Sequence, residues 1–206
     1  MARFQEFRRL AEKLPVVSLA DLETALPGLR RETIYRWRKS GYINMVAPGF
    51  YVLAGSIETE QDLFAIASRL YTPSFVSLES ALAWYGLIPE TPLAVTSVTT
   101  RKTRTISSEI GEFIYRTVKP GYWFGYSIEE TQRGKFMIAR PERAIIDLLY
   151  LRQDLRTPGD FIELRLNGER LGPITGDLLE TAGRFQNRML LKRCHMLLEV
   201  VEHAGS

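Results

Sequence analysis

The sequence has few residues of the kinds that close disulfides or cross membranes. It holds one cysteine, Cys194, so no disulfide can form within its 206 residues. No apolar run approaches the roughly 20 residues that a membrane-spanning helix needs. The N-terminal segment is charged throughout, which is unlike a signal peptide. These absences predict a cytoplasmic protein with no membrane partner.

Motifs for catalysis and metal binding are also lacking. The two histidines, His195 and His203, lie on one predicted helix and, together with Cys194, have no metal-ligand spacing. The sequence contains no HExxH, P-loop, GxSxG or GxGxxG motif. We therefore expect no catalytic residue, no metal site, no cofactor and no enzymatic activity.

Charge is unevenly distributed along a chain of ordinary globular composition. Hydrophobic residues make up 45% and charged residues 25%, and the formal net charge is +3. Residues 1–56 hold nine basic and five acidic residues, residues 57–100 hold one and five, and residues 101–140 hold eight and four. Two basic blocks separated by an acidic one indicate local patches rather than a uniformly basic chain.

Residues 18–53 have the order of a helix-turn-helix followed by a β-wing. Ser18 is a candidate N-cap with Asp21 three residues on, an imperfect capping box. Pro27-Gly28 predicts the turn between two helices, Gly41 ends the second helix, and Pro48-Gly49 joins two short strands. The expected elements are helices over residues 3–13, 19–26 and 30–40 and strands over 43–46 and 50–53.

The helix over 30–40 has the two faces that a recognition helix needs. Ile34 and Trp37 are three residues apart and would pack inward, leaving the basic residues outside. Arginine can bond guanine as a bidentate pair, and both arginine and lysine bind phosphates. The alternative is a solvated basic helix without a partner. The predicted DNA-binding residues are Arg30, Arg31, Glu32, Thr33, Tyr35, Arg36, Arg38 and Lys39.

Two further features bear on the size of a DNA footprint. Arg101, Lys102 and Arg104 follow a predicted strand and form a second basic patch. This patch could extend the footprint, contact an acidic protein or RNA, or be an exposed charged loop. The wing tip, residues 47–49, carries no lysine or arginine, so it either touches only the DNA backbone or is a structural hairpin.

The rest of the chain predicts an α+β domain with a helical tail. Its expected strands lie over residues 93–100, 112–118, 125–130 and 135–139. Its expected helices lie over residues 60–71, 78–86, 158–166, 175–183 and 188–202, and a further helix begins at Pro141. The predicted fold class is thus α+β, with a winged helix-turn-helix domain over 1–55 and an α+β domain over 56–206.

Two clusters in this second part leave alternatives open. The aromatic segment 122–126 suits either an interface or a small core. Asp147, Asp160 and Glu163 could form a nuclease set, although helix surfaces carry such carboxylates routinely.

Four segments together resemble one family. They are RWRKSGYI at 36–43, PGFYVL at 48–53, SLESALAWYGLIPETP at 77–92 and ARPERAIIDLLYLR at 139–152. With them the chain resembles the AbiEi-like antitoxins, the repressor-antitoxins of bacterial abortive-infection and type IV toxin–antitoxin systems. Residues after about 155 take no part in the resemblance.

The resemblance implies a function that residue patterns alone do not give. Such proteins use the winged helix to bind inverted repeats of double-stranded DNA at their own promoter, and their larger domain supplies antitoxin activity. The implied toxin is a nucleotidyltransferase-type protein, neutralised without a tight complex. Two half-sites would be bound by a dimer or by two cooperating monomers.

Other functions are compatible with the same pattern. The main alternative is a ligand-responsive winged-helix transcription regulator with no toxin partner, which would need a pocket with convergent polar groups. A winged helix used for protein docking and a metal-dependent nuclease are the remaining alternatives.

Overall fold

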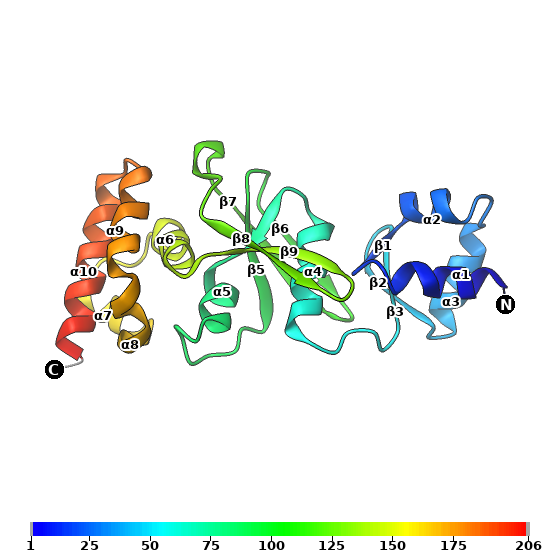
Figure 1. Cartoon of the computed structure of the whole chain (residues 1–206), viewed down its shortest axis with the longest axis horizontal. Coiled ribbons are helices and arrows are strands. Elements are labelled where there is room, and N and C mark those ends of the chain that lie inside the picture. Colours follow the sequence, from blue (N-terminus) through cyan, green and yellow to red (C-terminus); the bar gives the residue numbers. More distant parts are fainter. Residues whose placement is uncertain (1, 205–206) are drawn as a thin grey trace.

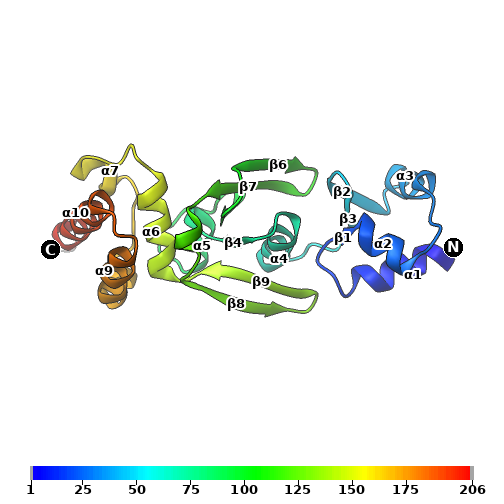
Figure 2. The same cartoon turned by 90° about the horizontal axis from the view of Figure 1, so that it is seen from above.

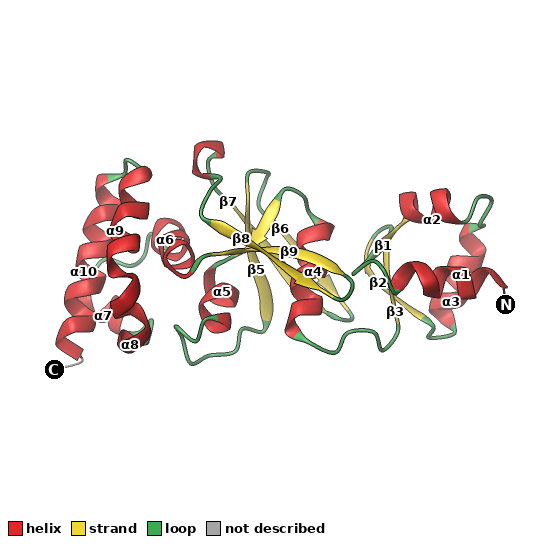
Figure 3. Cartoon of the chain, viewed as in Figure 1, coloured by secondary structure: helices red, strands yellow, loops and turns green. Residues whose placement is uncertain are grey.

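The structure is a computed structural model that describes residues 2–204, and it has the expected α+β class. Three parts follow one another along the longest axis: N-terminal helices with a small sheet, a larger sheet with two helices, and a group of C-terminal helices (Figure 1). Figure 3 shows that the strands are confined to the first two parts. Among the described helices, none is long and apolar enough to cross a membrane.

The N-terminal part is a helix-turn-helix with a wing, as the sequence predicts. Its three-stranded sheet has the order β1-β3-β2, with both pairs antiparallel. Ser18 and Asp21 form a complete capping box, since each accepts a hydrogen bond from the backbone N–H of the other. The elements are α1 (Ala2–Ala11), β1 (Val17–Ser18), α2 (Leu19–Ala25), α3 (Arg31–Lys39), β2 (Ile43–Ala47) and β3 (Phe50–Leu53).

The middle part is built on a six-stranded mixed sheet of order β6-β7-β5-β4-β9-β8. Its two outer pairs are antiparallel hairpins, and α4 lies between them (Figure 2). Helix α4 packs on β9, β4 and β5, and α5 packs on β5 and α6. The elements are α4 (Glu60–Leu70), β4 (Ser74–Val76), α5 (Leu78–Trp84), β5 (Ala94–Thr99), β6 (Arg104–Ser108), β7 (Gly111–Thr117), η1 (Pro120–Tyr122), β8 (Tyr126–Thr131) and β9 (Gly134–Ala139).

The C-terminal part is helical, again as expected. Helix α6 joins it to the sheet, because it packs on α5 and β9 on one side and on α9 and α10 on the other. The elements are α6 (Pro141–Leu151), α7 (Pro158–Ile162), α8 (Gly168–Leu171), η2 (Gly172–Ile174), α9 (Thr175–Arg184) and α10 (Arg188–Ala204). The helix predicted over 158–166 ends early, since Arg165 has a positive φ of 50° and Asn167 caps a new helix.

A buried ion pair fixes α6 against the sheet. Arg143 and Asp147 lie one turn apart on α6 with both side chains fully buried, and 2.7 Å separates Nη2 from Oδ1. Ser77, at the N-cap position of α5, makes no capping bond, and its hydroxyl donates instead to Asp147 at 2.7 Å. Arg143 also donates to the carbonyls of Tyr122 and Phe124. These bonds offset the cost of burying both charges.

The aromatic segment 122–126 belongs to the core. Tyr122, Trp123, Phe124 and Tyr126 are half-buried and pack on the main core. Phe75 stacks on Tyr126 at 5.1 Å, and Phe185 lies 4.2 Å from Tyr122 between ring centroids. Of the two interpretations of this segment, the structure therefore favours the core.

The wing packs into the second part of the molecule. Val46, Ala47 and Val52 are buried in the same cluster as the core around α4. An ion pair reinforces this contact, since Arg69 of α4 donates to both carboxylate oxygens of Asp21 at 2.7 and 2.8 Å. One face of the wing sheet is thus covered by the middle part of the chain.

Candidate nucleic-acid interface

Helix α3 is held by apolar packing on its inner side. Ile34 is 5% exposed, and the Trp37 ring lies 5.3 Å from Phe4 and 5.6 Å from Phe7 between centroids. The helix ends before Gly41, whose φ of +71° is one that other residues rarely adopt. This packing leaves the remaining side chains of α3 on the outside.

The predicted DNA-binding residues lie on that outer side. Arg30 stands at the N-cap position of α3. Thr33 is half-buried, and the other predicted residues, Arg30 included, are exposed. The exposed members are Arg30, Arg31, Glu32, Tyr35, Arg36, Arg38 and Lys39. Within the described part of the chain, only Arg38 among these cations forms an ion pair.

A groove of about 470 Å³ runs between α3 and the wing. Arg31, Tyr35 and Arg38 line it from the helix, and Pro48 and Tyr51 line it from the wing. These helix residues are spaced by about one turn, so they present one continuous row. Glu32, Arg36 and Lys39 have the same spacing on a neighbouring row, and Arg36 donates weakly to the Thr33 hydroxyl at 3.4 Å.

Arg38 has a partner that the sequence does not indicate. Its Nη2 lies 3.4 Å from Oε1 of Glu109 in the turn between β6 and β7, 71 residues away. Its Nη1 also approaches the Met45 sulfur at 3.9 Å. A carboxylate from the second part of the chain thus stands beside the candidate DNA-binding face.

The second basic patch is ordered by an aromatic ring. The guanidinium groups of Arg101 and Arg104 lie 4.3 and 5.4 Å from the centre of the Tyr71 ring. The Tyr71 hydroxyl donates to the Lys102 carbonyl at 3.0 Å. The patch is not simply a loop, because β6 begins at Arg104.

Part of this patch reaches the winged helix. A groove of about 640 Å³ is lined by Arg38, by Pro48 of the wing, by β6 and by Glu109 in the turn that follows it. Arg104 therefore shares a groove with α3, whereas Arg101 and Lys102 do not line it. Ala47, at the wing tip, is 6% exposed and faces the second part of the chain, which supports a structural role for the tip.

The carboxylates considered for a nuclease do not gather. Asp147 is buried with Arg143 and Ser77, and burial raises its pKa while those partners lower it. Asp160 accepts the backbone N–H groups of Arg156 and Thr157 at the start of α7, which lowers its pKa. No group of three His, Cys, Asp or Glu side chains suited to a metal occurs in residues that the structure describes.

The solitary cysteine has no reactive setting. Cys194 is fully buried on α10, and burial raises the pKa of its thiol to about 12. The thiol therefore stays protonated at neutral pH and behaves as a small apolar side chain.

The N-terminal part of the structure is thus a winged helix with an exposed basic helix. Residues 5–54 match a family described as "Transcriptional regulator, AbiEi antitoxin". The match confirms the resemblance to the AbiEi-like antitoxins and supports a DNA-binding regulator of the antitoxin kind. No curated protein matches the chain by sequence.

The whole fold has a counterpart among solved structures. The crystal structure of the RV2827C protein from Mycobacterium tuberculosis superposes with a TM-score of 0.59 over 98% of this chain and 78% of that chain. The two sequences are 13% identical, so this likeness concerns the fold alone. The similarity extends beyond the winged helix to the sheet and the C-terminal helices.

Proposed function

We propose that this protein is a transcriptional autorepressor and the antitoxin of a type IV toxin–antitoxin system of bacterial abortive infection, acting in phage defence. Residues 1–55 bind inverted repeats in its own promoter, and residues 56–206 carry the antitoxin function. The family match over residues 5–54 supports a DNA-binding regulator of the antitoxin kind. The toxin is a nucleotidyltransferase-type protein that is neutralised without a tight complex.

The observation that carries the DNA-binding role is the outer face of α3. Four cations there, Arg30, Arg31, Arg36 and Lys39, are exposed and make no ion pair in the described chain. The α3–wing groove places Arg31 and Tyr35 beside the wing, where a duplex would lie. Arg104 extends the positive surface along β6. This arrangement supports promoter occlusion by α3 in the major groove.

Two experiments test the two halves separately. Full-length protein should bind its own promoter in a mobility-shift assay, with an affinity that falls steeply as salt increases. Two protein copies per operator are expected, as two half-sites require. Co-expression with an adjacent nucleotidyltransferase-like gene should rescue the growth of cells that the toxin alone inhibits. Both proteins are proposed to act in the cytoplasm. A lack of salt-dependent duplex binding refutes the repressor role, and a lack of rescue refutes the antitoxin role.

A second candidate function is a ligand-responsive regulator without a toxin partner. It is favoured by one observation, a large cleft bordered by α6 and α10 in the C-terminal part. Absence of growth rescue, combined with a small molecule that changes operator affinity, would favour this function over the antitoxin.

A further inference from the structure

A basic cleft of about 880 Å³ opens among α6, α10 and the end of β7. The helices that border it, α6 and α10, lie toward the end of the molecule opposite α3 (Figures 1 and 2). Its cations are Arg116, Lys119, Arg156, Lys192 and Arg193, and no Asp or Glu lines it. A concave wall with one sign of charge concentrates anions, and it does so independently of the DNA-binding face.

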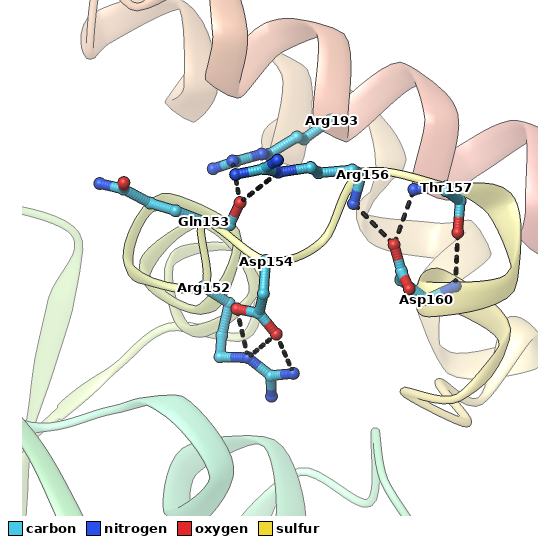
Figure 4. A network of polar contacts seen from close by, with 7 residues as sticks. All are labelled: Arg152, Gln153, Asp154, Arg156, Thr157, Asp160 and Arg193. Atoms are coloured by element: carbon cyan, nitrogen blue, oxygen red, sulfur yellow. Dashed lines mark hydrogen bonds and ion pairs between the residues drawn. The ribbon is translucent and has the colours of Figure 1, made fainter.

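Two of the guanidinium groups are held next to each other. Arg193 Nη2 and Arg156 Nε both donate to the Gln153 carbonyl, at 3.0 and 3.3 Å, and Arg193 Nη1 donates to the Leu149 carbonyl at 2.9 Å. Figure 4 shows the two side chains lying alongside each other. Both Nη groups of Arg156 and the Nε of Arg193 remain available as donors. Two like charges fixed together suit a ligand that carries opposite charge.

Neither nearby carboxylate forms a hydrogen bond or ion pair with the side chains of this pair, although the charge of Asp154 attracts Arg193. Asp154 is bonded to Arg152, with the shortest N–O distance 2.6 Å, and Asp160 caps α7 (Figure 4). Elsewhere in the cleft, the side chains of Arg116 and Lys192 have no hydrogen bond or ion pair within the described chain. The cleft thus keeps several cations free of internal partners.

Besides its cations and the polar residues Thr117, Gln153 and Asn187, the cleft is lined by apolar and aromatic side chains. They include Tyr150, Leu151, Met189, Leu190 and Met196. The volume is in the range of small-molecule sites, and it far exceeds what one phosphate ion fills. A ligand that uses both kinds of wall has an anionic part and a flat or apolar part.

We propose that this basic cleft binds a nucleoside phosphate. The phosphates bind the paired guanidinium groups of Arg156 and Arg193 and the neighbouring cations, and the nucleoside packs on the wall that contains Tyr150 and Met196. Arginine binds phosphate through several parallel N–H donors. The Gln153 carbonyl, which accepts hydrogen bonds from both Arg156 and Arg193, holds two such groups of donors close together.

The test is calorimetric titration of the full chain with ATP and GTP, using pyrophosphate and adenosine as half-ligands. We expect the triphosphates to bind at least about tenfold more tightly than either half-ligand, with an affinity that falls as salt rises. Binding of pyrophosphate as tight as that of ATP, or no nucleotide binding up to millimolar concentration, overturns the proposal.

Two charge reversals of exposed lysines form a matched pair. Lys192→Glu places a carboxylate in the cleft and should weaken nucleotide binding at least about tenfold, whereas Lys135→Glu on β9, away from the lining, should change it less than about twofold. Both residues are exposed, and thermal unfolding checks that both variants fold. Equal weakening by the two variants refutes a local site.

Two further measurements separate the cleft from nucleic-acid binding. Arg36→Ala on α3 should leave nucleotide affinity unchanged. A loss of nucleotide binding in the Arg36→Ala variant would place the nucleotide on the candidate DNA-binding face instead and would overturn the proposal. A short single-stranded RNA that binds about tenfold more tightly than ATP, in a manner lost with Lys192→Glu, would assign the cleft to RNA and overturn the nucleotide proposal.

Discussion

Glu109 in the β6–β7 turn lies 3.4 Å from Arg38 of the candidate recognition helix. The two side chains are 58% and 41% exposed, so their attraction contributes little to stability. If Arg38 contacts DNA as proposed, a carboxylate at this place would compete with a phosphate for Arg38 and would repel the duplex backbone. The contact places a negative charge from the second part of the chain beside the candidate DNA-binding face.

Glu109→Gln should therefore strengthen promoter binding, by about two- to fivefold at moderate salt. If the released Arg38 takes a phosphate, the salt dependence should also steepen by about one counterion. Fluorescence anisotropy over a range of salt concentrations measures both quantities. Glu163→Gln on the distant C-terminal part removes the same charge and should change neither. Weaker binding in Glu109→Gln would show that the ion pair orients Arg38 for DNA.

Arg36→Ala should cost about 1–3 kcal/mol of promoter affinity and relax sequence preference if the guanidinium contacts a base. A contact to phosphate alone predicts an even loss across sequences and a smaller salt slope. Competition binding with scrambled promoters distinguishes the two. An unchanged affinity together with an unchanged preference would remove Arg36 from the interface, and Arg188→Ala on α10 provides the distant control.

Asp147→Ala should destabilise the protein by about 3–5 kcal/mol, because it leaves the Arg143 guanidinium buried without a carboxylate. Urea denaturation measures the loss. The double change Arg143→Met with Asp147→Leu should recover part of it, since no buried charge then remains. Arg152→Ala breaks an exposed pair and should have little effect. A stable Asp147→Ala variant would contradict a structural role for the pair.

Asp21 should make stability fall in acid. Burial by itself would raise the pKa of Asp21, but hydrogen bonds from Ser18 and the ion pair with Arg69 outweigh it and hold the pKa below the ordinary 3.8. A lowered pKa contributes stability above the unfolded value, and this contribution is lost as pH falls through the folded value. The difference in unfolding free energy between the wild type and Asp21→Asn should shrink below about pH 4. A constant difference would show that the charge of Asp21 does not stabilise the fold.

Local patterns sufficed to predict much of the fold. Ser18 before an apolar helix and Gly41 after a basic one mark boundaries that the structure confirms within a residue or two. The inward packing of Ile34 and Trp37 follows from their spacing and was likewise predictable. The outward face of α3, which carries the proposed function, is therefore a consequence of local sequence.

Three strands, β1, β4 and β6, were not predicted from the sequence, because local patterns do not mark them. Strand β1 has two residues and β4 has three, so neither is long enough for a periodic pattern, and pairing with neighbouring strands stabilises each. Strand β6 lies at an edge where only Ile106 is buried, so its charged residues resemble a loop. The order of the sheet and the Arg38–Glu109 contact depend on residues far apart in the chain, which no local pattern encodes.

The burial of Val46, Ala47 and Val52 against α4 has a practical consequence for dissecting this protein. A fragment truncated near residue 55 would expose these side chains to water, so it would tend to self-associate or rearrange its hairpin. DNA-binding measurements on such a fragment would therefore describe an altered winged helix. Because the wing shares a buried core with the second part of the chain, the position of α3 relative to the rest of the molecule depends on the intact polypeptide.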